Sequence, residues 1–273
     1  MLIALQGAVS QGVLWGIMVL GVFITFRLLD IPDMTCDGSF ALGGCVCAVL
    51  IVNNNVDPLL AVLAGMCAGA IAGAVTGILT TVFEIPAILA GILTQISLWS
   101  INLRIMGTGT GGGKANLPIS VDKYSLLVSA RYVRALALNN PIFVLLIFCA
   151  VLIGVLYWFF GTELGCSLRA TGANQHMARA QGINTNVTIV LGLMVSNGLV
   201  ALAGGLLSQY QGFSDINMGR GAIVIGLAAV IIGEVIFGAR FNFAYQLGSI
   251  VAGSVIYQIV IAFVLQLGLS TED

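Results

Sequence analysis

Long apolar runs separated by short polar stretches make up almost the whole chain. A helix that crosses a bilayer needs about 20 predominantly apolar residues. Six runs have that length, at 9–29, 58–83, 86–106, 141–160, 188–208 and 245–267. Pro58 and Pro86 begin two of them, and the first turn of a helix tolerates proline because its missing N–H has no partner there anyway. The pattern therefore predicts an all-α, polytopic bundle of membrane helices.

Two further apolar runs, 38–52 and 222–237, are short for a span. The first contains Gly43-Gly44 and is long for a loop, so we expect a re-entrant or broken helix there. With these two runs the bundle should hold about eight membrane segments. The first long run has no Lys or Arg before it and exceeds the length of a signal-peptide core, which predicts a retained anchor rather than a cleaved signal.

Composition supports a location in the membrane. Of the 273 residues, 59% are hydrophobic and only 8% are charged, whereas a soluble domain carries about 25% charged residues. So few charges cannot cover a surface that faces water. We therefore expect a multi-pass protein of the plasma membrane, with the lipid bilayer as its solvent. The net charge of −1 provides no basic field for nucleic acid.

Glycine recurs every fourth residue in the third apolar run. The four positions are Gly65, Gly69, Gly73 and Gly77. This spacing places them along one stripe of a helix, where small residues let two helix backbones approach closely. The stripe predicts tight helix packing and carries no information about a solute.

Sequence motifs for catalysis, metal binding or a cofactor are not found. The stretch 107–114, GTGTGGGK, differs from a phosphate-binding loop because Thr108 stands where the first Gly is needed and Ala115 replaces the magnesium-binding hydroxyl. His176 is the single histidine, so no histidine pair exists for a metal. The six cysteines lack paired zinc spacing and are expected to be small buried hydrophobes. We predict a protein that is not an enzyme and holds no cofactor.

Acidic residues near the two short runs are candidates for a solute path. Charges at membrane depth are costly and by default face a cavity or a partner, although Asp33 and Asp37 are equally consistent with a plain loop. Residues 33–34 and 215–218 each precede a short, glycine-bearing run, and such a weak internal repeat points to the central site of a transporter. The candidate path residues are Asp33, Thr35, Asp37, Ser39, Gln95, Asn102 and Glu234.

The polar stretch 161–183 reads GTELGCSLRATGANQHMARAQGI. It resembles the cytoplasmic coupling loop of permeases in the branched-chain amino acid and ribose importer family, at Thr162, Gly165, Arg169-Ala170, Gly172, Asn174, Ala178-Arg179 and Gly182-Ile183. The stretch 33–44, DMTCDGSFALGG, resembles the loop after the first span of these permeases. The stretch 84–107 is similar to a subgroup associated with uptake of aromatic amino acids. The family continues with one more span, so we expect a final span to be missing here.

The resemblance implies a single permease domain over 1–273 that carries an amino acid, branched-chain or aromatic, across the membrane. It implies two ATPase subunits, an extracytoplasmic solute-binding protein and a second permease, identical or similar, as partners. ATP hydrolysis would take place in the ATPase subunits. A sugar or nucleoside is the alternative solute, and an ion-coupled secondary transporter is the alternative of another class.

The resemblance also implies which residues contact the ATPase, and it fixes the orientation. The coupling residues are Glu163, Arg169, Ala170, Asn174, Ala178, Arg179, Gly182 and Ile183. With 161–183 inside the cell, 107–138 lies outside, although its Lys and Arg residues would place it inside under the positive-inside rule. A cytoplasmic N-terminus then requires 38–52 to re-enter without crossing, and the chain would end outside.

Overall fold

The computed structural model of the protein describes residues 2–108, 113–120, 124, 126–129, 141–238 and 242–266, with side chains from Leu5 onward. Seven helices in these residues are long and apolar enough to cross a membrane. They are α1 (Leu2–Phe23) with its π-helical continuation η1 (Ile24–Leu28), α2 (Thr35–Asn54), α3 (Pro58–Thr81), α4 (Ala87–Met106), α5 (Pro141–Gly161), α8 (Thr185–Gln211) and α10 (Phe243–Gln266). A shorter apolar helix, α9 (Ala222–Phe237), completes the set. The prediction of an all-α bundle with about eight membrane segments is confirmed.

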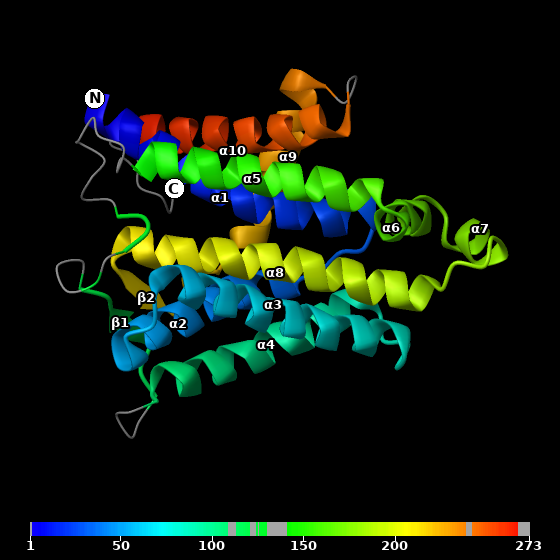
Figure 1. The fold of residues 1–273 in the computed structure, drawn as a ribbon, viewed down its shortest axis with the longest axis horizontal. Helices are drawn as coiled ribbons and strands as arrows, with labels where there is room; N and C mark the ends of the chain where they lie inside the picture. Colours follow the sequence, from blue (N-terminus) through cyan, green and yellow to red (C-terminus); the bar gives the residue numbers. More distant parts are fainter. Residues whose placement is uncertain are drawn as a thin grey trace.

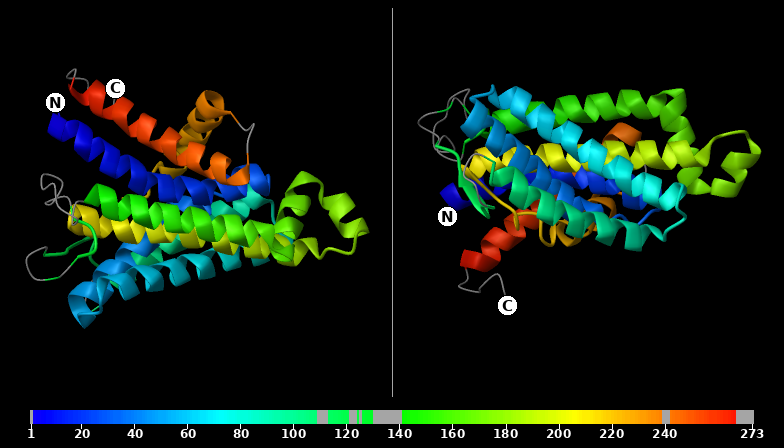
Figure 2. Two further views of the ribbon diagram at one scale, coloured as in Figure 1. Left: turned by 45° about the horizontal axis from the view of Figure 1, so that its top comes forward. Right: turned by 90° about the horizontal axis from the view of Figure 1, so that it is seen from below.

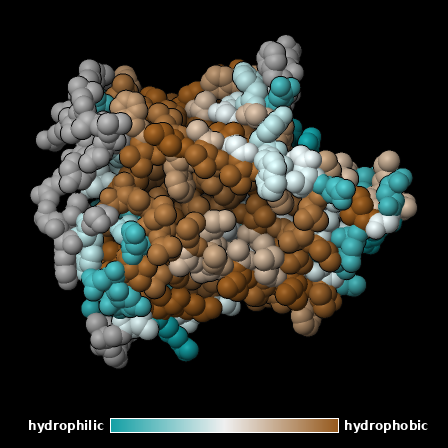
Figure 3. All heavy atoms as spheres, viewed as in Figure 1, coloured by the Kyte–Doolittle hydropathy of each residue, from teal (hydrophilic) through white to brown (hydrophobic). Residues whose placement is uncertain are grey.

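The two ends of the bundle differ in structure. The short helices α6 (Glu163–Ala173) and α7 (Gln175–Ala180) project from one end, which we call the α7 end (Figure 1). The antiparallel strands β1 (Asn116–Pro118) and β2 (Phe213–Asp215) lie at the opposite end, which we call the β end. The views in Figure 2 show the long helices extending between these two ends. Figure 3 shows a broad apolar belt between the ends and polar side chains at both of them, as a membrane-spanning bundle requires.

The expectation that 38–52 re-enters without crossing is wrong. Helix α2 has 20 residues and its apolar character suffices for a span. The apolar run understates its length, because the first turn is polar yet buried inside the bundle, with Thr35 fully buried. Helix α1 accordingly begins at the β end, the side opposite to α7 (Figure 1), so the N-terminus and the stretch 161–183 do not share a side of the membrane.

The segment after β2 also crosses the bundle, because Glu234 near the end of α9 pairs with Arg27 of η1 and α10 starts beside Arg169 of α6. The chain leaves β2 at the β end and reaches the start of α9 inside the bundle, next to Asp37 near the start of α2. Helix α9 then runs to Phe237 and covers only part of the membrane thickness with its 16 residues. The loop residues Lys123, Arg131 and Arg134, like the segment 267–273, lie outside the described residues.

The glycine stripe of α3 lies against α8 and α2. A Cβ atom at Gly69 would touch Ala201, and one at Gly73 would collide with the carbonyl of Leu193. A Cβ at Gly77 would lie 2.9 Å from the Cα of Val190, while Gly65 faces the backbone of α2 at Gly43. The backbones of these helices therefore approach so closely that even a methyl group has no room.

Replacing Gly73 by valine is expected to lower the melting temperature of the detergent-solubilised protein by several degrees. The added side chain meets the backbone of α8, which cannot move aside, and overpacking of this kind costs about 1–3 kcal/mol or more. The fraction that stays monodisperse after heating measures the effect. Gly154→Val in α5 is the matched control, because nothing lies within 4 Å of a Cβ there. Equal melting temperatures for the two variants would contradict the packing described for α3.

Candidate functional site

Helix α2 begins in the interior of the bundle rather than at its end. Its N-cap residue Met34 lies against Gly91, and Gly38 lies against Gln95 and Leu98 in the middle of α4. The non-helical segment 29–34 leads back to this point from the α7 end. Such backbone is tolerated at membrane depth only where protein buries it or where it lines a cavity. The region around the start of α2 is therefore a candidate functional region.

A buried polar network surrounds this start. The Asn197 Nδ2 of α8 donates a 2.6 Å hydrogen bond to Oδ2 of Asp33, and Asn197 Oδ1 accepts a 2.7 Å bond from the Ser39 hydroxyl. Asp33 Oδ1 accepts the backbone N–H of Thr35 at 2.9 Å. These side chains are at most 1% exposed. The network satisfies their polar groups and closes them off from any solute.

A second set of hydroxyls extends the network to α3 and α4. The hydroxyls of Thr35 and Thr76 share a 2.8 Å hydrogen bond, and Thr76 donates a 3.0 Å bond to the hydroxyl of Thr94. The predicted path residues Asp33, Thr35 and Ser39 thus lie in a closed network that connects α2 to α3, α4 and α8. Their position indicates that they hold the helices in register rather than line an open path.

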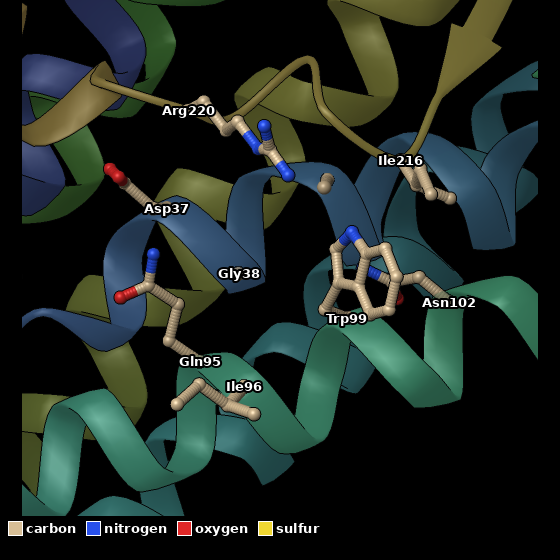
Figure 4. A pocket seen from close by; sticks show the side chains of 9 residues that line it. Asp37, Gly38, Gln95, Ile96, Trp99, Asn102, Ile216 and Arg220 are labelled. Atoms are coloured by element: carbon tan, nitrogen blue, oxygen red, sulfur yellow. The ribbon is translucent and has the colours of Figure 1, made fainter. Parts of the chain in front are cut away.

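An open pocket of about 400 Å³ lies beside this network, between α2, α4 and the segment 216–221 (Figure 4). This volume is within the range of small-molecule sites, about 300–1,000 Å³. The lining side chains that carry polar or aromatic groups are Asp37, Gln95, Trp99, Asn102 and Arg220. The structure therefore brings together three of the predicted path residues, Asp37, Gln95 and Asn102.

Asp37 fastens the start of α9 to α2. Its Oδ1 accepts the backbone N–H of Ile223 at 2.9 Å, and its Oδ2 accepts that of Gly221 at 3.1 Å. These N–H groups belong to the N-cap residue and the first turn of α9 and have no partner within the helix. Gly221 has a φ of +76°, a conformation that a side chain strains. The carboxylate occupies the positive end of α9, as an N-terminal cap does.

Two polar groups of the pocket have no partner among the residues that the structure describes. Asn102 is 1% exposed, and neither its amide oxygen nor its amide nitrogen makes a hydrogen bond within the described part of the chain. Arg220 is exposed, and its guanidinium forms no ion pair with any residue that the structure describes. An unpaired buried amide costs free energy unless a ligand or water satisfies it. The pocket therefore has free hydrogen-bonding capacity inside a largely apolar bundle.

Arg220 and Trp99 were not among the predicted path residues. Arg220 lies in a segment without helical periodicity, and its role depends on how the chain between β2 and α9 turns into the interior of the bundle. Trp99 belongs to the apolar run of α4, where an aromatic residue carries no signal in the sequence. A basic residue directly before a short apolar run is the one cue that could have indicated Arg220.

The remaining path candidate, Glu234, lies apart from the pocket. It sits near the end of α9, where its Oε1 accepts a 3.0 Å bond from Nε of Arg27 in η1. This ion pair is partly exposed, with 60% and 20% of the two side chains accessible. Glu234 therefore joins α9 to α1 and does not contact the pocket.

A second pocket, between α2, α3 and α4, is a poor candidate for a polar solute. It measures about 370 Å³ and is lined almost entirely by apolar side chains such as Leu42, Ile71 and Leu98. Transfer of a charged group into such surroundings without a partner is costly. The pocket with Asp37 and Arg220 is the better site for a charged or polar molecule.

At the α7 end, side-chain caps define the short helices. Thr162 caps α6, Asn174 caps α7 by accepting the N–H of Met177 at 3.0 Å, and Asn184 caps α8. Arg179 donates a 2.7 Å bond to the hydroxyl of Thr185, and Ala178 is buried. Asn174, Ala178 and Arg179 therefore shape the α6–α7 hairpin from within.

Other parts of the hairpin face outward. Glu163, Ala170 and Gly182 are exposed, and Ile183 is half-buried. Gly182 has a φ of +84° and turns the chain between α7 and α8. Met177 is 64% exposed at the tip, an apolar residue that the sequence analysis did not single out.

Helix α6 joins the hairpin to the bundle. Gly172 packs so closely on the carbonyl of Leu28 in η1 that no side chain fits there. The Arg169 guanidinium lies 5.1 Å from the ring centre of Phe243 in α10, and Thr171 shares a 3.0 Å hydrogen bond with Thr188 in α8. The hairpin is thus attached to three membrane helices.

Comparison with known proteins identifies a family and two similar proteins. The family model for the permease component of the branched-chain amino acid transport system matches residues 4–272. A tyrosine transport system permease protein of Clostridioides difficile (strain R20291) is 40% identical over 264 residues, which cover 97% of this chain and 84% of that protein. An uncharacterised protein of Rickettsia prowazekii (strain Madrid E) is 32% identical over 266 residues, which cover 96% of this chain and 89% of that protein.

Among solved structures, PsaBC from Streptococcus pneumoniae in complex with Fab covers 94% of this chain and 90% of its own, with 20% identity and a TM-score of 0.41. At this level of similarity, neither the fold nor the function of the chain can be inferred from that structure.

Proposed function

The chain belongs to the family of permease components of the branched-chain amino acid transport system, and from this premise we propose that it forms the translocation path of an ATP-driven importer for an aromatic amino acid. The chain is a transport permease and a multi-pass protein of the cell membrane. Its relative with 40% identity carries the name of a tyrosine transport permease. The solute class in the proposal rests on that relative, and the pocket with Asp37 and Arg220 provides a place for a zwitterion.

The α6–α7 hairpin supports the ATP-driven part of the proposal. An ATPase needs a rigid projection that transmits a displacement to the membrane helices. The hairpin has internal caps, an exposed tip at Met177 and attachments to η1, α8 and α10. We infer that two ATPase subunits dock on this hairpin in a pair of permeases, and that an extracytoplasmic binding protein delivers the solute at the β end.

Met177→Asp is expected to weaken co-purification with the ATPase subunits about tenfold or more and to abolish uptake of labelled tyrosine. The substitution places a charge at the apolar tip of the hairpin, where no described side chain depends on it, so the melting temperature should stay the same. Lys114→Glu, a charge change at the β end, is the control for docking and should leave co-purification with the ATPase subunits unchanged. Normal co-purification of the Met177→Asp variant would show that the hairpin is not part of the surface on which the ATPase docks.

The test of the whole proposal is uptake into vesicles that contain the permease, its ATPase and its binding protein. We expect tyrosine uptake that depends on ATP. Uptake that persists without any ATPase and follows an ion gradient would show that the protein is a secondary transporter and not part of an ATP-driven importer.

A further inference from the structure

The pocket between α2, α4 and the segment 216–221 holds polar groups whose chemistry matches one kind of molecule. Arg220 supplies a cation without a partner in the described part of the chain, and Asn102 supplies a buried amide without one. Trp99 lies between them and is 45% exposed. Figure 4 shows the guanidinium of Arg220 extending from the segment before α9 toward the space above Trp99, with the Asn102 amide behind the indole ring.

The charges at one end of the pocket fit the head group of an α-amino acid. Arginine binds a carboxylate through parallel hydrogen bonds. Asp37 already accepts two backbone N–H groups, so the positive end of α9 is occupied. The carboxylate of a solute would therefore bind to Arg220. Each carboxylate oxygen of Asp37 keeps a lone pair that can accept a bond from an ammonium group. Gln95, whose side chain reaches toward Asp37 in Figure 4, adds a neutral partner.

The opposite end of the pocket fits an aromatic ring that carries a hydroxyl. The indole of Trp99 offers a flat apolar face on which a ring can stack. Behind it, the Asn102 amide is unpaired among the described residues and 1% exposed, so a hydroxyl reaches it once the Trp99 ring shifts aside, and the amide can then donate to and accept from that hydroxyl. A site built to bond a hydroxyl rejects the analogue without it, because its own polar group is then left unpaired in a buried place.

We propose that this pocket is a solute-recognition site of the permease itself, which binds a zwitterionic, hydroxyl-bearing aromatic amino acid through Arg220, Asp37, Trp99 and Asn102. The inference rests on the proposed function, since it assigns the solute class to a place in the fold. In this proposal, two separate side chains of the permease discriminate two separate groups of the solute.

The binding experiment uses the full chain in lipid nanodiscs, without a binding protein. The sequence contains three tryptophans, so replacement of Trp15 and Trp158 by phenylalanine leaves Trp99 as the reporter. Quenching of its fluorescence is titrated with L-tyrosine, with L-phenylalanine, which lacks the hydroxyl, and with tyramine, which lacks the carboxylate. We expect L-tyrosine to bind about tenfold or more tightly than either analogue, as expected for the loss of one strong hydrogen bond.

Two substitutions separate the two ends of the pocket. Arg220→Gln should erase the preference for tyrosine over tyramine and leave the preference over phenylalanine. Asn102→Leu should do the reverse. Arg104→Gln, at an exposed arginine on the same helix as Trp99 and outside the pocket, is the control and should change neither. Because Arg220 is exposed, its variant should fold normally, so the Arg220 result decides the proposal even where Asn102→Leu is unstable.

The outcomes distinguish this inference from the proposed function. Unchanged preferences in both variants, or no response of Trp99 to millimolar tyrosine, overturn the recognition site. When the complete importer still takes up tyrosine in that case, the proposed function stands without it. When the complete importer takes up no amino acid, the proposed function fails and the inference fails with it.

Discussion

Asn197→Asp is expected to be among the most damaging substitutions of similar size in this bundle. Asn197 donates to the carboxyl of Asp33 at 2.6 Å, and both side chains are fully enclosed. The substitution removes the donor and places two acidic groups in contact without water, although the side-chain volume stays the same. The cost should be about 3 kcal/mol or more in the free energy of unfolding. We expect a melting temperature lower by ten degrees or so and little folded protein after solubilisation.

The paired substitution Asp33→Asn with Asn197→Asp provides the control. It exchanges donor and acceptor across the same contact, and Ser39 still has an oxygen to which it can donate. We expect the double variant to recover most of the lost stability, since the interaction energy between two contacting residues appears in such a cycle. Equal melting temperatures of the single and double variants would show that the contact does not determine stability.

Asp37→Ala should free the start of α9 without unfolding the protein. Two hydrogen bonds to a charged acceptor are lost, and each contributes about 1.5–3 kcal/mol. Hydrogen–deuterium exchange of the segment 216–226 should therefore become about 100-fold faster or more, and tyrosine uptake should fall with it because the pocket loses its shape. Exchange in α3 and α8 should stay slow.

Two further variants refine this test. Asp37→Asn keeps one acceptor oxygen and should lie between the wild type and Asp37→Ala. Asp57→Ala is the matched control, because Asp57 also precedes a helix but its side chain makes no capping bond. Unchanged exchange at 216–226 in Asp37→Ala would show that other contacts hold α9 in place.

The apolar pattern predicted the helices well where contact with lipid or close helix packing restricts which residues can occur. The run 222–237 coincides with α9, and the glycine spacing in 65–77 marks a helix face that packs closely. It failed at α2, where polar residues in the first turn belong to the helix because partners in the bundle satisfy them. Hydropathy measures preference for lipid, so it cannot detect a helix end that is buried in protein.

The site was predictable only in part for a similar reason. Gln95 and Asn102 could be chosen because each interrupts an apolar run of α4. Asp33 and Asp37 are four residues apart and look alike in the sequence, yet one is enclosed beside Asn197 and the other caps α9. Their different roles depend on partners more than 160 residues away along the chain, and no local pattern encodes such contacts.

The position of α9 has a mechanical consequence. With 16 residues it forms a rigid rod about 24 Å long. One end of the rod is clamped by Asp37 at the rim of the pocket, and Glu234 near the other end is tied to Arg27. Arg27 and Leu28 lie in the same π-helical turn, and Leu28 bears directly on Gly172 of α6. In the proposed importer, a displacement of the α6–α7 hairpin would be transmitted through these contacts to α9, whose other end lies beside Arg220 in the proposed solute site.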